Sequence, residues 1–190
     1  TVFFSQLWRE AVSRSVEEFN VLKALKFLET AAWHSELPSW SLSEEAGLYL
    51  ETGNKTDFWQ DTYYGFHRDD GHFFGASIEA DFTATLEFEG LYKSLYDQTG
   101  LMVRLDHDNW VKAGIEFSDQ ETNFSIVVTR NGRSDWSVIA CPKVSGPQSV
   151  RLTHINAAML AHYLGVDGRW YLMRVADFPN DRKMQLGPDR

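Results

Sequence analysis

The chain of 190 residues has a single cysteine, Cys141, and no apolar run that approaches the length of a membrane span. One thiol cannot close an internal disulfide, so folding does not depend on an oxidising compartment and a cytoplasmic location is expected. A signal peptide would show a basic segment, then an apolar run and a small-residue cleavage site, and the sequence shows no such pattern. We expect Cys141 to be a small packed side chain rather than a nucleophile.

Basic residues are scarce, with 18 Lys and Arg against 27 Asp and Glu and a formal net charge of -9. A phosphate backbone or an anionic lipid surface attracts a basic field, so neither nucleic acid nor a membrane is an expected partner. The sequence also has no glycine-rich phosphate loop, no dinucleotide fingerprint and no evident Ser-His-Asp arrangement. No cofactor is therefore expected.

Metal ligands are also poorly represented. The six histidines form no pair at ligand spacing beside a carboxylate. Residues 106–109 read Asp-His-Asp-Asn, which offers oxygen ligands for Ca²⁺ but is equally typical of a polar hairpin turn. The turn is the favoured interpretation, and no metal site is predicted.

Aromatic residues, in contrast, make up 14% of the chain, and hydrophobic residues make up 43%, enough for the core of one domain. Aromatic side chains are common in strands and in sandwich cores. They also line sugar-binding surfaces, where their rings stack on the ligand.

The clearest local pattern lies in residues 97–117, where two runs of alternating residues flank a polar turn and predict a β-hairpin. Strand geometry sends alternate side chains to opposite faces. One face is apolar, with Leu101, Val103, Leu105, Val111, Ala113, Ile115 and Phe117. The other face carries Met102, Arg104, Asp106, Trp110, Lys112, Gly114 and Glu116.

Other segments repeat this alternation. Residues 77–89 read as one long amphipathic strand, and residues 122–130 and 134–140 flank an Asn-Gly turn. Further strands are expected at residues 48–52, 148–153, 159–164 and 169–175. About ten short strands with turn chemistry between them indicate an all-β sandwich or jelly roll of antiparallel sheets.

The two ends of the chain are expected to differ from this body. Apolar residues recur at helical spacing in residues 4–19 and predict an amphipathic helix, which either packs on the domain or binds a partner. The residues concerned are Phe4, Leu7, Trp8, Ala11, Val12, Val16 and Phe19. We therefore expect a helical extension at 1–22, a jelly-roll domain at 23–178 and a fraying polar tail at 179–190.

The polar face of the hairpin is the first candidate site. Arg104, Lys112 and Glu116 project from adjacent strands, and they would form either a surface ion network or the floor of a groove with Trp110 as a stacking platform. Two acid and tryptophan pairs, Asp57 with Trp59 and Asp135 with Trp136, extend the candidate set. For these pairs, ligand contact competes with turn capping and core packing.

Glycoside hydrolysis requires two carboxylates about 5–10 Å apart across a cleft. Glu116 is the leading candidate acid, but Gly114 and Ser118 occupy the neighbouring positions on its face. The close Glu-x-Asp-x-Glu row of many jelly-roll glucanases is absent. A glycoside hydrolase or lyase reaction that uses Glu116 remains an alternative, but the sequence has no clear signal for it.

Four segments in a fixed order resemble the regulation-of-enolase protein family. They are residues 56–59 (TDFW), 97–104 (DQTGLMVR), 109–116 (NWVKAGIE), and 125–137, which begins SIVVTR and ends SDWS. The resemblance covers about residues 25–178 and implies a concanavalin A-like lectin/glucanase jelly roll. It transfers no catalytic set, and the matching positions that would build a site are Asp57, Trp59, Asp97, Gln98, Arg104, Trp110, Lys112, Glu116, Asp135 and Trp136.

The sequence thus favours a non-catalytic module that binds a carbohydrate or another polar small ligand on a concave sheet face. Glycoside hydrolase or lyase chemistry at Glu116 and a regulatory protein-interaction domain are the alternatives. A protein partner and the oligomeric state stay open.

Overall fold

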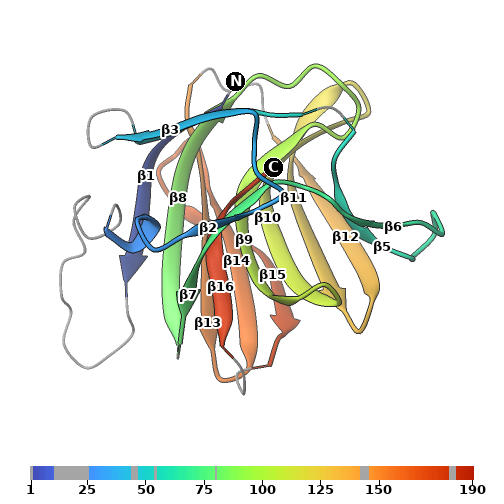
Figure 1. The fold of residues 1–190 in the computed structure, drawn as a ribbon. Helices are drawn as coiled ribbons and strands as arrows, with labels where there is room; N and C mark the ends of the chain where they lie inside the picture. Colours follow the sequence, from blue (N-terminus) through green and yellow to red (C-terminus); the bar gives the residue numbers. More distant parts are fainter. Residues whose placement is uncertain are drawn as a thin grey trace.

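The computed structural model describes residues 2–10, 26–43, 47–53, 55–79, 81–141, 146–179 and 183–190. Within these residues, two seven-stranded antiparallel sheets pack face to face as a sandwich, with a separate two-stranded ribbon at one side (Figure 1). The all-β jelly-roll sandwich expected from the alternation is therefore confirmed.

Sheet A has the order β15-β14-β13-β8-β1-β4-β3. Its strands are Trp170–Asp177 (β15), Ala158–Leu164 (β14), Gln148–Ile155 (β13), Phe82–Gly90 (β8), Val2–Glu10 (β1), Gly47–Glu51 (β4) and Ser39–Ser43 (β3).

Sheet B has the order β12-β11-β10-β9-β16-β7-β2. Its strands are Arg133–Ala140 (β12), Glu121–Arg130 (β11), Asn109–Ser118 (β10), Gln98–Asp106 (β9), Met184–Asp189 (β16), Phe73–Ile78 (β7) and Ala32–His34 (β2). The separate ribbon pairs Phe58–Gln60 (β5) with His67–Asp69 (β6).

The main core lies between the two sheets and is built from one face of each strand. Phe82, Leu86 and Phe88 of β8 are almost fully buried, and the apolar face of the β9–β10 hairpin meets them. The hairpin predicted at residues 97–117 is confirmed, as is the Asn-Gly turn at Asn131, where both turn residues have positive φ.

A second, smaller core covers the outward face of sheet B, the face that points away from sheet A. Phe58 and Trp59 of the β5–β6 ribbon pack there against Met102, Trp110 and Val127. The backbone N–H of Gln60 donates to Ser134 Oγ, which ties the ribbon to β12 (2.8 Å). Part of the polar face predicted to line a groove is therefore covered by the ribbon.

The helix predicted for residues 4–19 is wrong over its first half, because residues 4–10 belong to strand β1. The backbone of β1 pairs with β8 on one side and with β4 on the other (Figure 1). A helix there would leave one edge of each neighbour without hydrogen-bond partners, so sheet pairing overrides the local periodicity. Residues 11–19 lie outside the described residues.

Two further sequence expectations are also wrong. Residues 184–189 do not fray but form β16, which lies between β9 and β7 in the interior of sheet B. The long strand expected at residues 77–89 is divided into β7, which belongs to sheet B, and β8, which belongs to sheet A. Non-local pairing decides both cases, and a local pattern does not report it.

Gly187 tests the interior position of β16. A Cβ on this residue would run into the carbonyl oxygen of Phe74 on β7, and backbone atoms cannot move aside as a side chain can. We expect Gly187→Ala to lower the free energy of unfolding by about 2 kcal/mol or more, measured by urea denaturation. Gln185→Ala, at an exposed position of the same strand, is the control and should change it by less than about 0.5 kcal/mol. Equal stability of the two variants would show that the end of β16 is not held in the sheet.

Candidate functional site

The candidate site lies on the outward face of sheet B, where strand register brings together residues far apart in the sequence. Opposite Lys112 on β10 lies Met102 on β9, and opposite Glu116 lies Gln98. Between these two rows, Gly114 faces Gly100. A Cβ on either glycine would collide with the backbone of the other strand, so the two strands approach closely and the face is hollowed between the rows.

Asp57 joins the ribbon to this floor. Its Oδ1 accepts hydrogen bonds from the backbone N–H of Phe58 (2.7 Å) and from Gln98 Nε2 (2.8 Å). Lys112 Nζ lies 3.4 Å from the same oxygen, and the Lys112 side chain is only 7% exposed. The Lys112 ammonium also lies over the rings of Phe58 and Trp110, at 5.9 and 5.6 Å from their centroids. The cation is thus held by one carboxylate and two aromatic faces.

Glu116 is the second acid of the floor. Its Oε2 accepts a hydrogen bond from Ser125 Oγ (2.8 Å), and Trp136 Nε1 donates to the same serine oxygen (3.1 Å). Burial raises the pKa of the Glu116 carboxyl, and the nearby Lys112 ammonium opposes this shift. A carboxyl group in such a place retains its proton to a higher pH than an exposed one.

Asp189 is a third acid near Lys112, and the sequence interpretation missed it. Strand β16 places it opposite Gly100, and it is buried, with 4% of its surface exposed. Its Oδ1 has no hydrogen-bond partner among the described residues. Burial raises the pKa of Asp189 to about 7, against the attraction of Lys112. Alternating Met184 and Leu186 are the sequence signal that would have predicted this strand.

Arg104 and Trp110 do not line an open groove. Arg104 makes two parallel hydrogen bonds to Asp69 of β6, at 2.7 and 2.8 Å, and is 7% exposed. Trp110 is fully buried beneath the ribbon, and its Nε1 donates to the carbonyl of His107 (3.2 Å). The expected stacking platform is therefore a packing residue, because the ribbon excludes a ligand from its ring.

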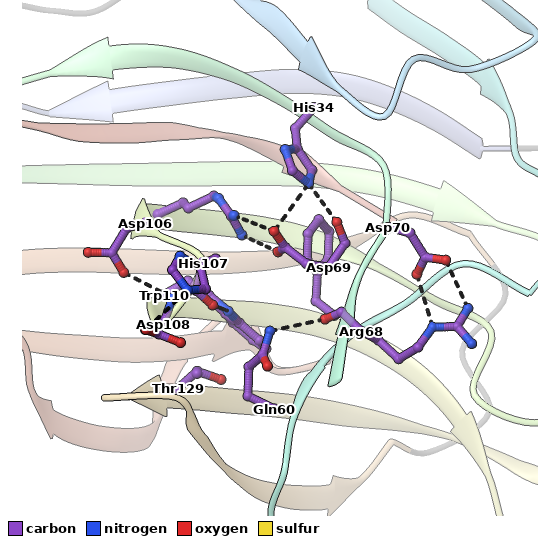
Figure 2. Close-up of polar contacts among 12 residues, drawn as sticks. His34, Gln60, Arg68, Asp69, Asp70, Asp106, His107, Asp108, Trp110 and Thr129 are labelled. Atoms are coloured by element: carbon purple, nitrogen blue, oxygen red, sulfur yellow. Dashed lines mark hydrogen bonds and ion pairs between the residues drawn. The ribbon is translucent and has the colours of Figure 1, made fainter. Parts of the chain in front are cut away.

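Two neighbouring acids at the end of the ribbon, Asp69 and Asp70, have different partners (Figure 2). Asp69 receives Arg104 and lies beside His34, whose Nε2 is 2.8 Å from the Asp69 carbonyl oxygen. Asp70 turns away and pairs with Arg68 at the surface (3.0 Å). Of these two acids, only Asp69 holds the ribbon to the sheet, through Arg104.

Aromatic residues close over the floor and form what we call the inner pocket, of about 40 Å³. Its lining comprises Asp57, Trp59, Tyr64, Phe66, Tyr96, Gln98, Lys112, Glu116, Val127 and Trp136. Six of the ten predicted site residues therefore meet at one place. Tyr64, Phe66 and Tyr96, from the loops that follow β5 and β8, were not among the predicted residues.

A larger depression, which we call the outer cleft, adjoins the inner pocket and has a volume of about 670 Å³. It shares four lining residues with the inner pocket, which are Asp57, Phe66, Tyr96 and Gln98. It adds the basic residues Lys55, Arg68 and Arg190. The two spaces together offer a narrow polar pocket that opens into a cleft of ligand size.

The last two predicted residues lie outside the inner pocket. Asp97 lines the outer cleft, but its Oδ2 accepts the backbone N–H groups of Lys93 and Ser94 and so caps a loop. Asp135 makes two hydrogen bonds to Arg174 of β15, at 2.7 and 3.1 Å, and links the edges of the two sheets. Both carboxylates have a structural role.

Among the described residues, no group of three or more His, Cys, Asp or Glu side chains is arranged to hold a metal ion. In the Asp106–Asn109 turn, Asp106 Oδ1 accepts from the Asp108 N–H and from Asn109 Nδ2 (both 2.9 Å). This supports the hairpin-turn interpretation. No helix in the described part of the chain has the length and apolar character required to span a bilayer.

The two facing antiparallel sheets define a β-sandwich protein. Residues 33–189 match a family described as "Protein of unknown function (DUF1349)", and the chain belongs to this family. It is 44% identical to Regulation of enolase protein 1 of Saccharomyces cerevisiae over 150 residues, which are 78% of this chain and 75% of that protein. The predicted resemblance to the regulation-of-enolase family is thus confirmed.

Solved structures agree with this assignment. A functionally unknown protein from Saccharomyces cerevisiae superposes with a TM-score of 0.79 at 39% identity, over 85% of this chain and 86% of that one. A GH43_12 protein from a capybara gut metagenome and the GH43 protein BlXynB of Bacillus licheniformis each give a TM-score of 0.55. These two align over 75% and 79% of this chain and only 29% and 30% of their own chains, at 12% and 15% identity, which shows a shared fold alone.

The contrast between Asp69 and Asp70 is testable. Asp69→Asn would leave the Arg104 guanidinium buried without its carboxylate, and we expect a loss of about 2 kcal/mol in the free energy of unfolding. Asp70→Asn breaks an exposed pair and should cost less than about 1 kcal/mol. Urea denaturation at neutral pH measures both. Equal effects would contradict the idea that Arg104 and Asp69 fasten the ribbon.

Asp189 predicts a pH dependence of stability. Its pKa is about 7 in the folded chain and near 4 in an unfolded one, so between these values the folded state binds the extra proton. The stability that protonated Asp189 contributes is therefore complete below about pH 4 and is lost as the pH rises through about 7. We expect the free energy of unfolding of the wild type, minus that of Asp189→Asn, to fall from pH 5 to pH 8 in urea denaturation, because the asparagine does not titrate. A constant difference across this range would show that Asp189 does not titrate there.

Proposed function

We propose that this chain is a non-catalytic binding module that holds a carbohydrate or another polar small ligand on the outward face of sheet B. The observation that carries the proposal is the inner pocket, which has charged and amide groups at its floor and aromatic rings at its walls. Aromatic platforms beside a few convergent polar groups are typical of ligand sites.

The volumes of the inner pocket and the outer cleft indicate which part of the ligand each would hold. The inner pocket has room for about three water molecules, which is the size of a substituent rather than a sugar ring. The outer cleft, at about 670 Å³, is within the range of about 300–1,000 Å³ usual for small-molecule sites. The body of the ligand would therefore lie in the outer cleft and extend one group into the inner pocket.

The polar groups of the floor suit a ligand that both donates and accepts hydrogen bonds. Asp57 and Glu116 present acceptors, while Gln98 and Lys112 present donors. Sugar hydroxyls need both kinds of partner. The floor is held by its own contacts before any ligand arrives, which limits the entropy lost on binding.

Glycoside hydrolase or lyase activity at Glu116 is the alternative with a structural argument. The raised pKa of Glu116 and the presence of Asp57 in the same pocket are features of an acid and base pair. The small volume of the inner pocket argues against it, because cleavage requires a glycosidic bond with a ring on each side to lie between the carboxylates. Binding without cleavage is therefore the better-supported function.

A regulatory role through a protein partner belongs to the proposal as a second candidate. The relative with 44% identity is named for regulation of enolase. Tyr63, at the tip of the ribbon, is 92% exposed, as expected of a residue that would be covered by a partner. A cytoplasmic location would suit this role.

Calorimetric titration against a panel of neutral and charged mono- and oligosaccharides tests the binding function. We expect measurable binding by the wild type and at least a tenfold weaker affinity for Lys112→Met, which keeps the length of the side chain but removes its donor. Asp135→Asn, outside the inner pocket, is the control and should bind as the wild type does. Thermal unfolding of each variant verifies folding. Absence of binding to every sugar would overturn the carbohydrate version, and release of reducing ends would favour the enzyme.

A further inference from the structure

The walls of the inner pocket form an aromatic box. Tyr64 meets Trp59 with ring centroids 5.4 Å apart at 75°, and it meets Tyr96 at 6.4 Å and 68°. Tyr96 in turn meets Trp136 at 6.4 Å and 87°. These neighbouring rings meet edge to face, so they surround the pocket from several directions and do not form one flat platform. The pocket is open on one side, where Tyr64 and Tyr96 are 40% and 41% exposed.

The polar atoms of these rings are already directed to protein partners. Trp59 Nε1 donates to the Thr62 carbonyl (3.0 Å), and Trp136 Nε1 donates to Ser125 Oγ (3.1 Å). The hydroxyls of Tyr64 and Tyr96 are 3.2 Å apart and bond to each other. The box therefore offers a guest mainly π surface, which attracts a cation and has no similar attraction for a neutral hydroxyl.

The floor of the box has an excess of negative charge. It contains two carboxylates, Asp57 and Glu116, and one ammonium, Lys112. The ammonium is paired with Asp57, whereas Glu116 is hydrogen-bonded by the neutral Ser125 hydroxyl. Glu116, at 6% exposure, is a buried carboxylate near Lys112, and a cationic guest would provide a second counter-charge.

The size of the box suits a small head group. Its volume of about 40 Å³ holds about three waters, which compares with the four heavy atoms of a trimethylammonium group. A methylated ammonium is weakly hydrated and loses little solvation on entry, unlike a primary ammonium. Several aromatic faces around one methylated ammonium give a favourable geometry for cation–π attraction.

We propose that the inner pocket binds a methylated ammonium head group, through the faces of Tyr64, Tyr96, Trp59 and Trp136 and the Glu116 carboxylate. The inference rests on the proposed binding function and specifies the chemical class of the ligand. The rest of the ligand lies in the outer cleft, which opens from the same walls. A hydroxymethyl group of a neutral sugar is the competing guest.

Choline and 3,3-dimethylbutan-1-ol provide the test, because they have the same shape and differ in the charge of the central atom. Calorimetric titration of the full chain at constant ionic strength should give at least tenfold tighter binding of choline. Glu116→Gln should reduce this ratio toward one, and Tyr96→Leu should weaken choline binding at least tenfold. Tyr171→Leu replaces a tyrosine of the same 41% exposure on sheet A and should leave choline binding unchanged.

Equal binding of the two probes by the wild type, tighter binding of the neutral alcohol, or no binding of either would overturn the inference. The wild-type ratio alone is decisive if a variant does not fold, and thermal unfolding detects that case. If choline does not bind while a neutral sugar from the panel does, the binding module stands and the cationic head group is wrong. If choline binds and no sugar does, the ligand is a cation that is not attached to a carbohydrate.

Discussion

Two ion pairs with buried cations and partly exposed carboxylates hold the β5–β6 ribbon against sheet B, and the site depends on them. Asp57 directly precedes β5 and pairs with Lys112, while Asp69 ends β6 and pairs with Arg104. Phe58 lies between them, with both cations within 6 Å of its ring centroid. Removal of these charges from water is unfavourable by itself, so the pairs persist because packing against Trp110 and Met102 accompanies them.

This attachment at the base of the ribbon also positions the aromatic walls. The loop between β5 and β6 carries Tyr64 and Phe66, and it contains positive φ angles at Asp61, Tyr63 and Gly65. Such a loop retains one conformation only if its ends are fixed. The Tyr64 hydroxyl then bonds to Tyr96, which raises the pKa of Tyr64 to about 12 and joins the ribbon to the loop after β8. The floor combines residues of sheet B with Asp57 at the start of the ribbon. The walls combine Trp59 of β5 and Trp136 of β12 with the two loops that carry Tyr64 and Tyr96.

Much of the sheet architecture could be predicted from the sequence, because alternation is a local property. The β9–β10 hairpin and its two faces follow directly from the residues, and so does the Asn131 turn. The position of the ribbon over Trp110 and the position of β16 between β9 and β7 could not be predicted, because both depend on long-range contacts. The alternation of Met184 and Leu186 indicates a strand but does not say which strands it pairs with. Asp189 was missed for that reason, whereas the floor residues Lys112 and Glu116 were found.

The facing glycines Gly100 and Gly114 have a consequence for how ligand preference can change within such a fold. The floor between them is shaped by backbone atoms, and any larger residue there would disturb the pairing of β9 and β10. Substitution of Gly100 or Gly114 would therefore destabilise the sheet before it could change the ligand preference. The loops that carry Tyr64 and Tyr96 lie outside the sandwich core and tolerate replacement. One inherited sandwich can thus acquire new ligands by exchange of its walls while the floor stays the same.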